Sequence, residues 1–332
     1  RWLPSGETVR VVDFSSVTTP GEYFVRADGL PDSDPFRIDP DAYVELGTAA
    51  LKGFYFNRAS TALLPDHAGA YARAAGHPDD KVLVHASAAS ATRPEGTLLS
   101  APKGWYDAGD YNKYIVNSGI STYTLLAAYE QFPEYFRRHD TAIPESGDAV
   151  PDILDEVKWN LEWMLDMQEP ADGGVYHKLT NKQFDGMSVM PVEAGAPRYV
   201  VQKSTAAALD FAAVMATASR VYRPYESRFP GLPARMRDAA VAAWQWAQSH
   251  PDAVYAQPDD IKTGGYDDKQ LQDEFFWAAT ELYLATGDMK YYTAMAPHLV
   301  EASVPGWSDV AGLPWMSLAQ HRDRLQAAER SR

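Results

Sequence analysis

Apolar residues recur with a helical spacing through most of the chain beyond residue 118, and this pattern restricts the fold more than any other feature. Steps of three and four residues predict helices at about 118–131, 151–168, 203–222, 234–249, 270–286, 290–302 and 309–326. No alternation of strands with these helices and no repeat of fixed period is visible, which argues against a nucleotide-binding sheet. The main domain is therefore predicted to be all-α.

The first 40 residues follow a different pattern. Short clusters of β-forming residues between Pro, Gly and Asp predict strands at 9–14, 22–26 and 35–38. A β-sandwich needs about seven strands, so three predict the last part of a β domain. An N-terminal extension packed on the main domain is the alternative. From Pro40 the spacing becomes helical, with Tyr43, Leu46, Ala50 and Phe54 three or four residues apart.

Composition excludes several classes of function. The chain has 332 residues, with 30 basic and 45 acidic side chains and a net charge of −15, which would repel nucleic-acid phosphates and anionic membrane surfaces. It has no cysteine, so disulfides, thiol nucleophiles and cysteine-based zinc sites are excluded. A membrane span would need a run of about eighteen apolar residues, and the sequence has none. Residues 57–103 predict a long loop, and such loops commonly form a lid or a wall of a binding site.

One stretch concentrates candidate functional residues. Residues 104–114 read Gly-Trp-Tyr-Asp-Ala-Gly-Asp-Tyr-Asn-Lys-Tyr, which places two carboxylates, four aromatic rings and two glycines in eleven positions. Glycines allow sharp turns, and aromatic rings offer flat surfaces on which a sugar can stack. Asp107 and Asp110, three residues apart, can face one cavity, where one carboxylate can serve as a base. The alternative is that one caps the following helix and the other is solvated.

The same stretch, continued to Gly119, resembles the signature of glycoside hydrolase family 9, the inverting cellulases. Further stretches are similar to that family over roughly residues 45–325, namely Phe54–Arg58, Gly76–Asp80, Ser87–Pro94 and Asp273–Tyr283. The resemblance implies an (α/α)₆ barrel of six inner and six outer helices, often preceded by an immunoglobulin-like domain. We therefore expect residues 1–40 to be the C-terminal part of such a domain and residues 41–332 to be the catalytic domain.

The resemblance also implies a mechanism. An inverting glycosidase uses one carboxylate to activate water and a carboxylic acid about 6.5–9.5 Å away to protonate the leaving oxygen. By resemblance Asp110 is the base and Asp107 helps to hold the water. Family members take the acid from a Glu in an Asn-Glu-Val-Ala-type segment near the end of the domain, and neither this segment nor the family's His-His-Arg loop occurs in the 332 residues. We therefore expect a barrel that is incomplete at its C-terminus, with a second fragment of the same protein as a possible partner.

Other side chains are assigned to the substrate and to a metal. Trp105, Tyr106 and Tyr111 could stack on glucosyl units or pack the barrel interior. His177 lies where the family carries a cleft histidine that binds sugar hydroxyls, although a lone histidine is often structural.

The metal assignment concerns acidic side chains near a loop-to-helix junction. Asp273 and Glu274, with Asp309 after a downstream Trp, match a calcium site of several family members, and oxygen ligands suit Ca²⁺. Acids at a helix N-terminus also need no metal, because they complement the helix dipole. The prediction is a structural Ca²⁺ and no organic cofactor.

These observations predict an endo-β-1,4-glucanase that hydrolyses cellulose-like glucans with inversion. The alternative is a non-catalytic glucan-binding protein, or an inactive fragment that lacks the acid Glu. The expected partner is a β-1,4-glucan or its oligosaccharides, with no nucleic acid and no membrane span. A polymeric substrate cannot enter a cell, so the expected location is secreted or periplasmic.

Overall fold

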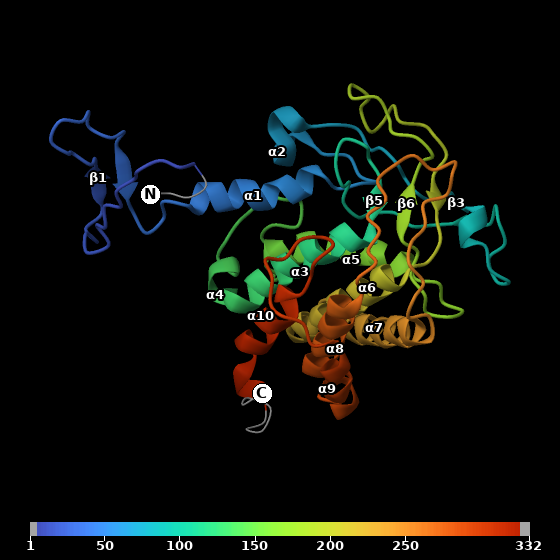
Figure 1. Cartoon of the computed structure of the whole chain (residues 1–332). Coiled ribbons are helices and arrows are strands. Elements are labelled where there is room, and N and C mark those ends of the chain that lie inside the picture. The colour runs from blue at the N-terminus through green and yellow to red at the C-terminus, as the bar shows by residue number, and fades with distance from the viewer. Residues whose placement is uncertain (1–4, 326–332) are drawn as a thin grey trace. The chain divides into compact units, whose positions relative to one another are not determined.

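The computed structural model describes residues 5–325. The chain forms two compact units, Arg1–Ala50 and Leu51–Arg332, and the boundary between them falls inside helix α1 (Val44–Phe56). Figure 1 traces the whole chain. None of the helices within residues 5–325 is both long enough and apolar enough to cross a bilayer.

The smaller unit contains a two-stranded antiparallel sheet. Strand β1 (Gly21–Tyr23) pairs with β2 (Phe36–Ile38), with Gly21 opposite Ile38 and Tyr23 opposite Phe36. Strands near 22–26 and 35–38 are thereby confirmed, but the strand predicted at 9–14 is wrong. That segment lacks a paired neighbour within the described residues, and its apolar side chains are exposed. β-forming residues alone do not make a strand, because the backbone groups need a partner strand.

The larger unit is mainly helical. Its helices, after the shared α1, are α2 (Pro65–Ala68), α3 (Ile115–Gln131), α4 (Pro133–Phe136), α5 (Asp152–Asp166), α6 (Thr205–Val221), α7 (Leu232–Ser249), α8 (Gln272–Thr286), α9 (Met289–Met295) and α10 (Gly312–Gln320). Single-turn 3₁₀ helices lie at Gly69–Tyr71, Ala86–Ala88, Arg223–Tyr225, Ala296–His298 and Arg322–Arg324. The helical prediction is confirmed for most elements.

Two helices are shorter than predicted. Helix α9 ends at Met295 instead of near 302, because Pro297 has no backbone N–H to continue the hydrogen-bond pattern. Helix α10 ends at Gln320, and the 3₁₀ turn that follows at Arg322–Arg324 replaces the predicted continuation. Residue 326, the end of that prediction, lies outside the described residues.

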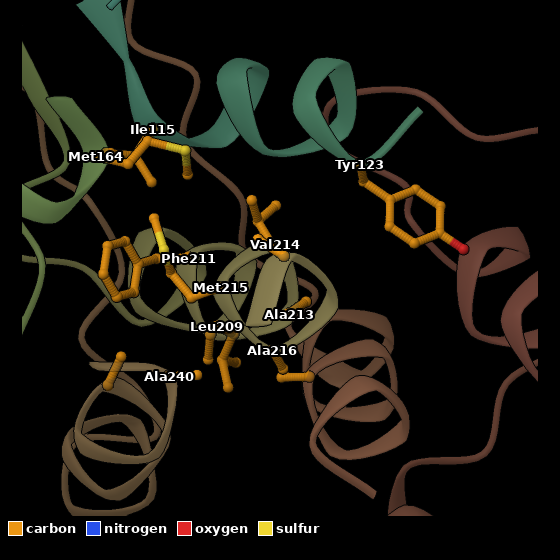
Figure 2. Packing of buried hydrophobic residues seen from close by; sticks show 14 of the residues in the cluster. Ile115, Tyr123, Met164, Leu209, Phe211, Ala213, Val214, Met215, Ala216 and Ala240 are labelled. Carbon is orange, nitrogen blue, oxygen red and sulfur yellow. The ribbon is translucent and has the colours of Figure 1, made fainter. Parts of the chain in front are cut away.

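Helix α6 forms the centre of the core. All of its residues are buried, including the charged Asp210 and Arg220, and it packs against α3, α7 and α8. Ser204 caps it by accepting a hydrogen bond of 3.2 Å from the backbone N–H of Ala207. Figure 2 shows Val214 pointing from α6 towards α3, whereas Leu209 points towards Ala240 on α7. The small side chains of α6 allow its neighbours to approach closely.

A small sheet corrects the all-α prediction. It contains β3 (Val82–Val84), β4 (Leu98–Leu99), β5 (Lys113–Tyr114), β6 (Lys178–Thr180) and β7 (Tyr199–Val200) in the spatial order β4-β3-β7-β6-β5. The β3–β7 pair is parallel and the other pairs are antiparallel. Figure 1 shows β3, β5 and β6 beside one another. Strands of two or three residues are too short to show an alternating pattern. The sheet matters for the site, because β5 connects the acidic stretch directly to α3.

Candidate active site

The acidic stretch is held to the helices at its N-terminal end. Gly104 has φ of +80°, and a Cβ there would lie 2.8 Å from Cγ of Trp163 on α5, so both the backbone and the space require glycine. The next residue, Trp105, donates its N–H to Oδ1 of Asn160 on α5 at 3.2 Å. The stretch therefore enters the site from a fixed anchor on α5.

The Asp110 carboxylate is held by donors from its own stretch. Oδ1 accepts the backbone N–H of Asn112 at 3.2 Å, and Oδ2 accepts the Asn112 side-chain amide at 3.0 Å and the Tyr114 hydroxyl at 2.7 Å. Burial and the Asp110 charge raise the pKa of Tyr114, so this phenol stays protonated and donates. These donors fix the orientation of a half-buried carboxylate, which a base that must point at water requires.

The Asp107 carboxylate is held by donors from elsewhere in the fold. Oδ1 accepts a short hydrogen bond from the Asn117 amide on α3, and Oδ2 accepts the Tyr266 hydroxyl at 2.9 Å. The residue is exposed overall, but partial burial of its carboxyl raises its pKa, while the bonds from Asn117 and Tyr266 lower it and the Asp110 charge raises it further. The two acids thus interact electrostatically and differ in environment, as acids with separate roles do.

A hollow of about 120 Å³ lies beside Asp107. Trp105, Tyr106 and Tyr114 line it from the acidic stretch, and Asn117 lines it from α3. Phe54 of α1 also contributes, and its ring centroid is 4.8 Å from that of Trp105. The structure therefore brings the two predicted acids, Asp107 and Asp110, together in one stretch beside aromatic rings.

The predicted stacking residues are each tied to the protein. Trp105 is buried and donates its indole N–H to Oε1 of Glu156 at 2.7 Å. Tyr106 is buried, and its hydroxyl shares a hydrogen bond of 2.9 Å with Nδ1 of His77. Burial lowers the pKa of His77 to about 4, which keeps this imidazole neutral. Trp105 and Tyr106 are therefore fixed in position, and each contributes to the lining of the hollow although it is largely buried.

Tyr111 packs against Tyr106, with ring centroids 5.1 Å apart. Its φ is +57°, and its hydroxyl donates to the carbonyl of Val189 at 2.5 Å. The guanidinium of Arg198 donates to the Tyr111 carbonyl at 2.7 Å. Tyr111 is half-buried, so it is tied to loop 181–198 while part of its ring stays accessible. It does not line the hollow that Trp105 and Tyr106 share.

His177 is completely buried. Its ring stacks on Tyr255 with centroids 3.9 Å apart, and its nitrogens contact the Ser204 hydroxyl and the Gly265 carbonyl, each at 2.8 Å. Burial lowers the pKa of His177 to about 4. In this structure the imidazole supports the loop that carries Tyr266 and has no free ring nitrogen. Its predicted contact with sugar hydroxyls stays a prediction and requires these bonds to be exchanged.

The predicted metal ligands lie around the start of α8, where Asp273 and Asp309 line one hollow. Asp273 accepts the backbone N–H of Val310 at 2.8 Å, which places Asp309 next to it, and Asp309 accepts a bond from the Ser303 hydroxyl. Glu274 is fully buried, and neither carboxylate oxygen has an amide, hydroxyl or cationic donor among the described residues. Burial raises its pKa well above the usual value, and the charges of neighbouring acids add to this effect.

The acidic side chains around the start of α8 are not arranged as a metal site in this structure. Within residues 5–325, no group of three or more His, Asp or Glu side chains is placed to coordinate a metal ion. The unpartnered oxygens of Glu274 and Asp210 nevertheless fit a hard cation in chemical type. Calcium at Asp273, Glu274 and Asp309 stays a prediction, and coordination needs these carboxylates to move together.

Sequence reasoning missed the donors that fix Asp107. Tyr266 lies 159 residues from Asp107 in the chain, and the Gly264-Gly265 pair before it was the visible signal of a special backbone. Asn117 lies within the family-like signature, at a spacing of ten residues from Asp107. Without the structure, nothing in the sequence shows that this asparagine and this tyrosine bind the Asp107 carboxylate.

Comparison with known proteins shows which family and fold the chain matches. The model of glycosyl hydrolase family 9 matches residues 43–330. A xyloglucan-specific endo-beta-1,4-glucanase, BoGH9A, from Bacteroides ovatus is 48% identical over 98% of this chain and 56% of its own length. Endoglucanase C from Cellulomonas fimi is 38% identical over 95% of this chain and 30% of its own length.

A solved structure described as Bacteroides ovatus GH9 matches with a TM-score of 0.90 and 47% identity, over 96% of this chain and 59% of that chain. The mainly helical fold of this chain is therefore the catalytic-domain fold of that family. The chain spans about half of the length of BoGH9A and less than a third of that of endoglucanase C.

Proposed function

This chain belongs to glycoside hydrolase family 9, and from that premise we propose that it carries the catalytic-base half of an endo-β-1,4-glucanase acting with inversion. Asp110 is the general base that takes a proton from water, and Asp107 holds that water. The single observation that carries this proposal is the pair of carboxylates fixed by different donors, where Asp107 lines an aromatic hollow and Asp110 is bonded to Tyr114, which lines it too. The family membership supplies the stereochemistry.

The two carboxylates have different roles because their surroundings differ. Asp110 accepts three hydrogen bonds, from Asn112 and Tyr114, which fix the orientation of its carboxylate. The carboxyl of Asp107 has its pKa raised by burial, so it gains a proton more readily. Water held between them would donate one hydrogen to Asp110 and orient its oxygen towards the anomeric carbon. The acid that protonates the leaving oxygen must face this pair from across the substrate.

The substrate is a β-1,4-glucan, with Trp105, Tyr106 and Tyr111 as the residues proposed to contact glucosyl units. Aromatic rings beside Asp107 support this assignment, since the hollow has both apolar faces and polar groups. The B. ovatus relative is described as xyloglucan-specific, which makes a substituted β-1,4-glucan a reasonable first substrate to test. A polymer of this kind places the protein outside the cytoplasm, secreted or periplasmic.

We also propose that residues 41–332 form an (α/α)₆ barrel that a further segment of the same protein completes, and that residues 1–40 end an immunoglobulin-like domain. An apolar cavity of about 400 Å³ on α8, α9 and α10 supports the first part, with Phe276, Trp315 and Leu318 among its lining. Met316 on α10 is 55% exposed. An apolar face of this kind suits the packing of another helix.

The test is hydrolysis of soluble β-1,4-glucan and xyloglucan by the intact protein and its Asp110→Asn variant. Asparagine keeps the size of the side chain and removes its charge, so kcat should fall about 10²–10⁴-fold while the fold is retained. Asp238→Asn, at an exposed aspartate on α7 whose side chain is 69% exposed, is the matched control and should keep full activity. Undiminished activity in Asp110→Asn would overturn the assignment, and an α-anomeric product detected by NMR would establish inversion.

A further inference from the structure

Lys178 is a buried lysine next to the site that the mechanism above does not use. Its side chain is completely buried on β6. The ammonium donates to the Gly264 carbonyl at 2.5 Å, to the Thr263 hydroxyl at 3.1 Å and to Oε1 of Gln257 at 3.1 Å. All three acceptors are neutral. Lysines are almost never fully buried without an opposite charge, so this position needs an explanation.

A chain of contacts joins Lys178 to Asp110. Gly264, whose carbonyl accepts from Lys178, donates its own N–H to the Tyr114 hydroxyl at 3.1 Å. That hydroxyl donates in turn to Oδ2 of Asp110 at 2.7 Å. Lys178 and Tyr114 are also direct partners across the β5–β6 pair, and the ammonium lies 5.6 Å from the centroid of the Tyr114 ring. Lys178 therefore contacts both the Gly264 backbone, which binds the Tyr114 hydroxyl, and strand β5, which carries Tyr114.

The geometry leaves little freedom at this junction. A Cβ on Gly264 would lie 3.2 Å from the Tyr114 hydroxyl and 2.9 Å from the Tyr266 ring, so the backbone passes closely between the phenols that bind Asp110 and Asp107. A displacement of Gly264 would move both hydroxyls. The hydrogen bond from the Lys178 ammonium to the Gly264 carbonyl holds that backbone in place.

Charge acts in the same direction. Burial lowers the pKa of Lys178 to about 7, and the Asp110 charge opposes this by raising it. The interaction is mutual, since a positive ammonium favours the ionised form of a nearby carboxylate. The Asp110 carboxylate is thus the negative charge that the buried ammonium faces, at a distance and through Tyr114.

We propose that Lys178 is a positioning residue for Asp110, which fixes the base through Gly264 and Tyr114 and supplies a positive charge that acts on it. This inference rests on the proposed function, in which Asp110 is the base. Lys178 itself does not touch the water or the sugar.

Other titratable groups face the same region and must be considered in any pH dependence. Asp110 is faced by Asp107 from its own stretch, by Tyr114 from β5 and by Tyr266 from the loop before α8. Lys178 is faced by Asp110, by the rings of Tyr114 and Tyr255 and by the neighbouring His177. Among these groups, Lys178 is the cation whose removal most directly affects Asp110.

The experiment measures kcat and KM of the intact protein on a soluble β-1,4-glucan between pH 4 and 9, for Lys178→Met, Lys178→Gln and Tyr114→Phe. We expect kcat to fall about tenfold or more in Lys178→Met with KM changed less than about threefold, since orientation of the base affects the chemical step. Its acidic limb should move upward by about half a pH unit or more, because a stabilising positive charge is lost.

Two variants separate the contributions. Lys178→Gln can still donate to the Gly264 carbonyl, so it should recover part of kcat and keep the shifted acidic limb. Lys182→Met, two residues beyond β6 and in a surface pair with Asp260, is the matched control and should leave kcat and the pH profile unchanged. Thermal melting of every variant reports on folding.

The outcomes distinguish this inference from the proposed function. A folded Lys178→Met variant with unchanged kcat and pH profile overturns the role of Lys178, while loss of activity in Asp110→Asn keeps the base assignment. If Lys178→Met does not fold, Tyr114→Phe answers the question, and full kcat in that variant refutes the connection. Full activity of Asp110→Asn overturns both proposals together.

Discussion

Glu130 on α3 offers a quantitative test of how the helices of the core are joined. Arg220 of α6 binds it in a bidentate manner, with distances of 2.8 and 2.9 Å, and also donates to Glu281 of α8 at 2.7 Å. His321, after α10, approaches the same Glu130 carboxylate at 3.3 Å. These side chains connect four helix segments through one buried guanidinium.

The magnitude follows from the pKa of Glu130. Its hydrogen bonds from His321 and Arg220 and the Arg220 charge lower this pKa from 4.5 to about 2, against the effect of burial. At about 1.4 kcal/mol for each pKa unit, the ionised carboxylate stabilises the folded state by about 3 kcal/mol at neutral pH. Because the folded pKa is the lower one, this stabilisation is complete above pH 4.5 and is lost as the pH falls towards 2.

We expect Glu130→Gln to lower the free energy of unfolding by about 2–4 kcal/mol at pH 7 and to weaken its dependence on pH below about 4.5. Urea denaturation followed by tryptophan fluorescence at several pH values measures both. Glu134→Gln, on the short helix α4 that follows α3 and with a side chain 70% exposed, is the control and should change stability by less than about 0.5 kcal/mol. A loss below about 1 kcal/mol in Glu130→Gln would refute the reasoning.

Two further variants test the anchor of the site and the predicted metal. Gly104→Ala should lower the free energy of unfolding by about 2 kcal/mol or more and reduce activity, since the added Cβ would lie 2.8 Å from Trp163. Gly96 has a similar φ of +79° with open space around it, so Gly96→Ala is the control and should cost only about 1 kcal/mol. Thermal melting measures both. Added Ca²⁺ should raise the melting temperature and EDTA should reverse this, an effect that Glu274→Gln should abolish. An equal response to Ca²⁺ in Glu274→Gln would contradict the calcium prediction.

The helices could be predicted from sequence because their evidence is local. Helix α6 is the clearest case, since most of its seventeen residues have apolar or small side chains that suit burial, with Asp210 and Arg220 as the charged exceptions. Helix α9 shows the limit of periodicity, because Pro297 ends a pattern that continues on apolar spacing alone. The sheet could not be predicted, since its strands have two or three residues and pair across long separations.

The site divides in the same way. The Asp107 and Asp110 pair was visible because both acids lie in one short stretch with aromatic residues and glycine. Burial of His177 and the contacts of Lys178 depend on loop 257–265, which is about 80 residues away in the sequence. No property of a lone histidine or lysine identifies such partners.

The difference between the two acids explains why the acidic stretch carries so much information. Asp110 obtains its donors from Asn112 and Tyr114, two and four residues further along, so the sequence that encodes the base also encodes its orientation. Asp107 depends on Tyr266, which only the completed fold brings near. Partial unfolding of the loop before α8 would therefore remove the Tyr266 donor from Asp107 and the Gly264 N–H from the Tyr114 hydroxyl, while the Asn112 donors of Asp110 stay in place. The proposed base thus keeps part of its orientation from local sequence, whereas the water-holding acid takes one of its two donors from a distant loop.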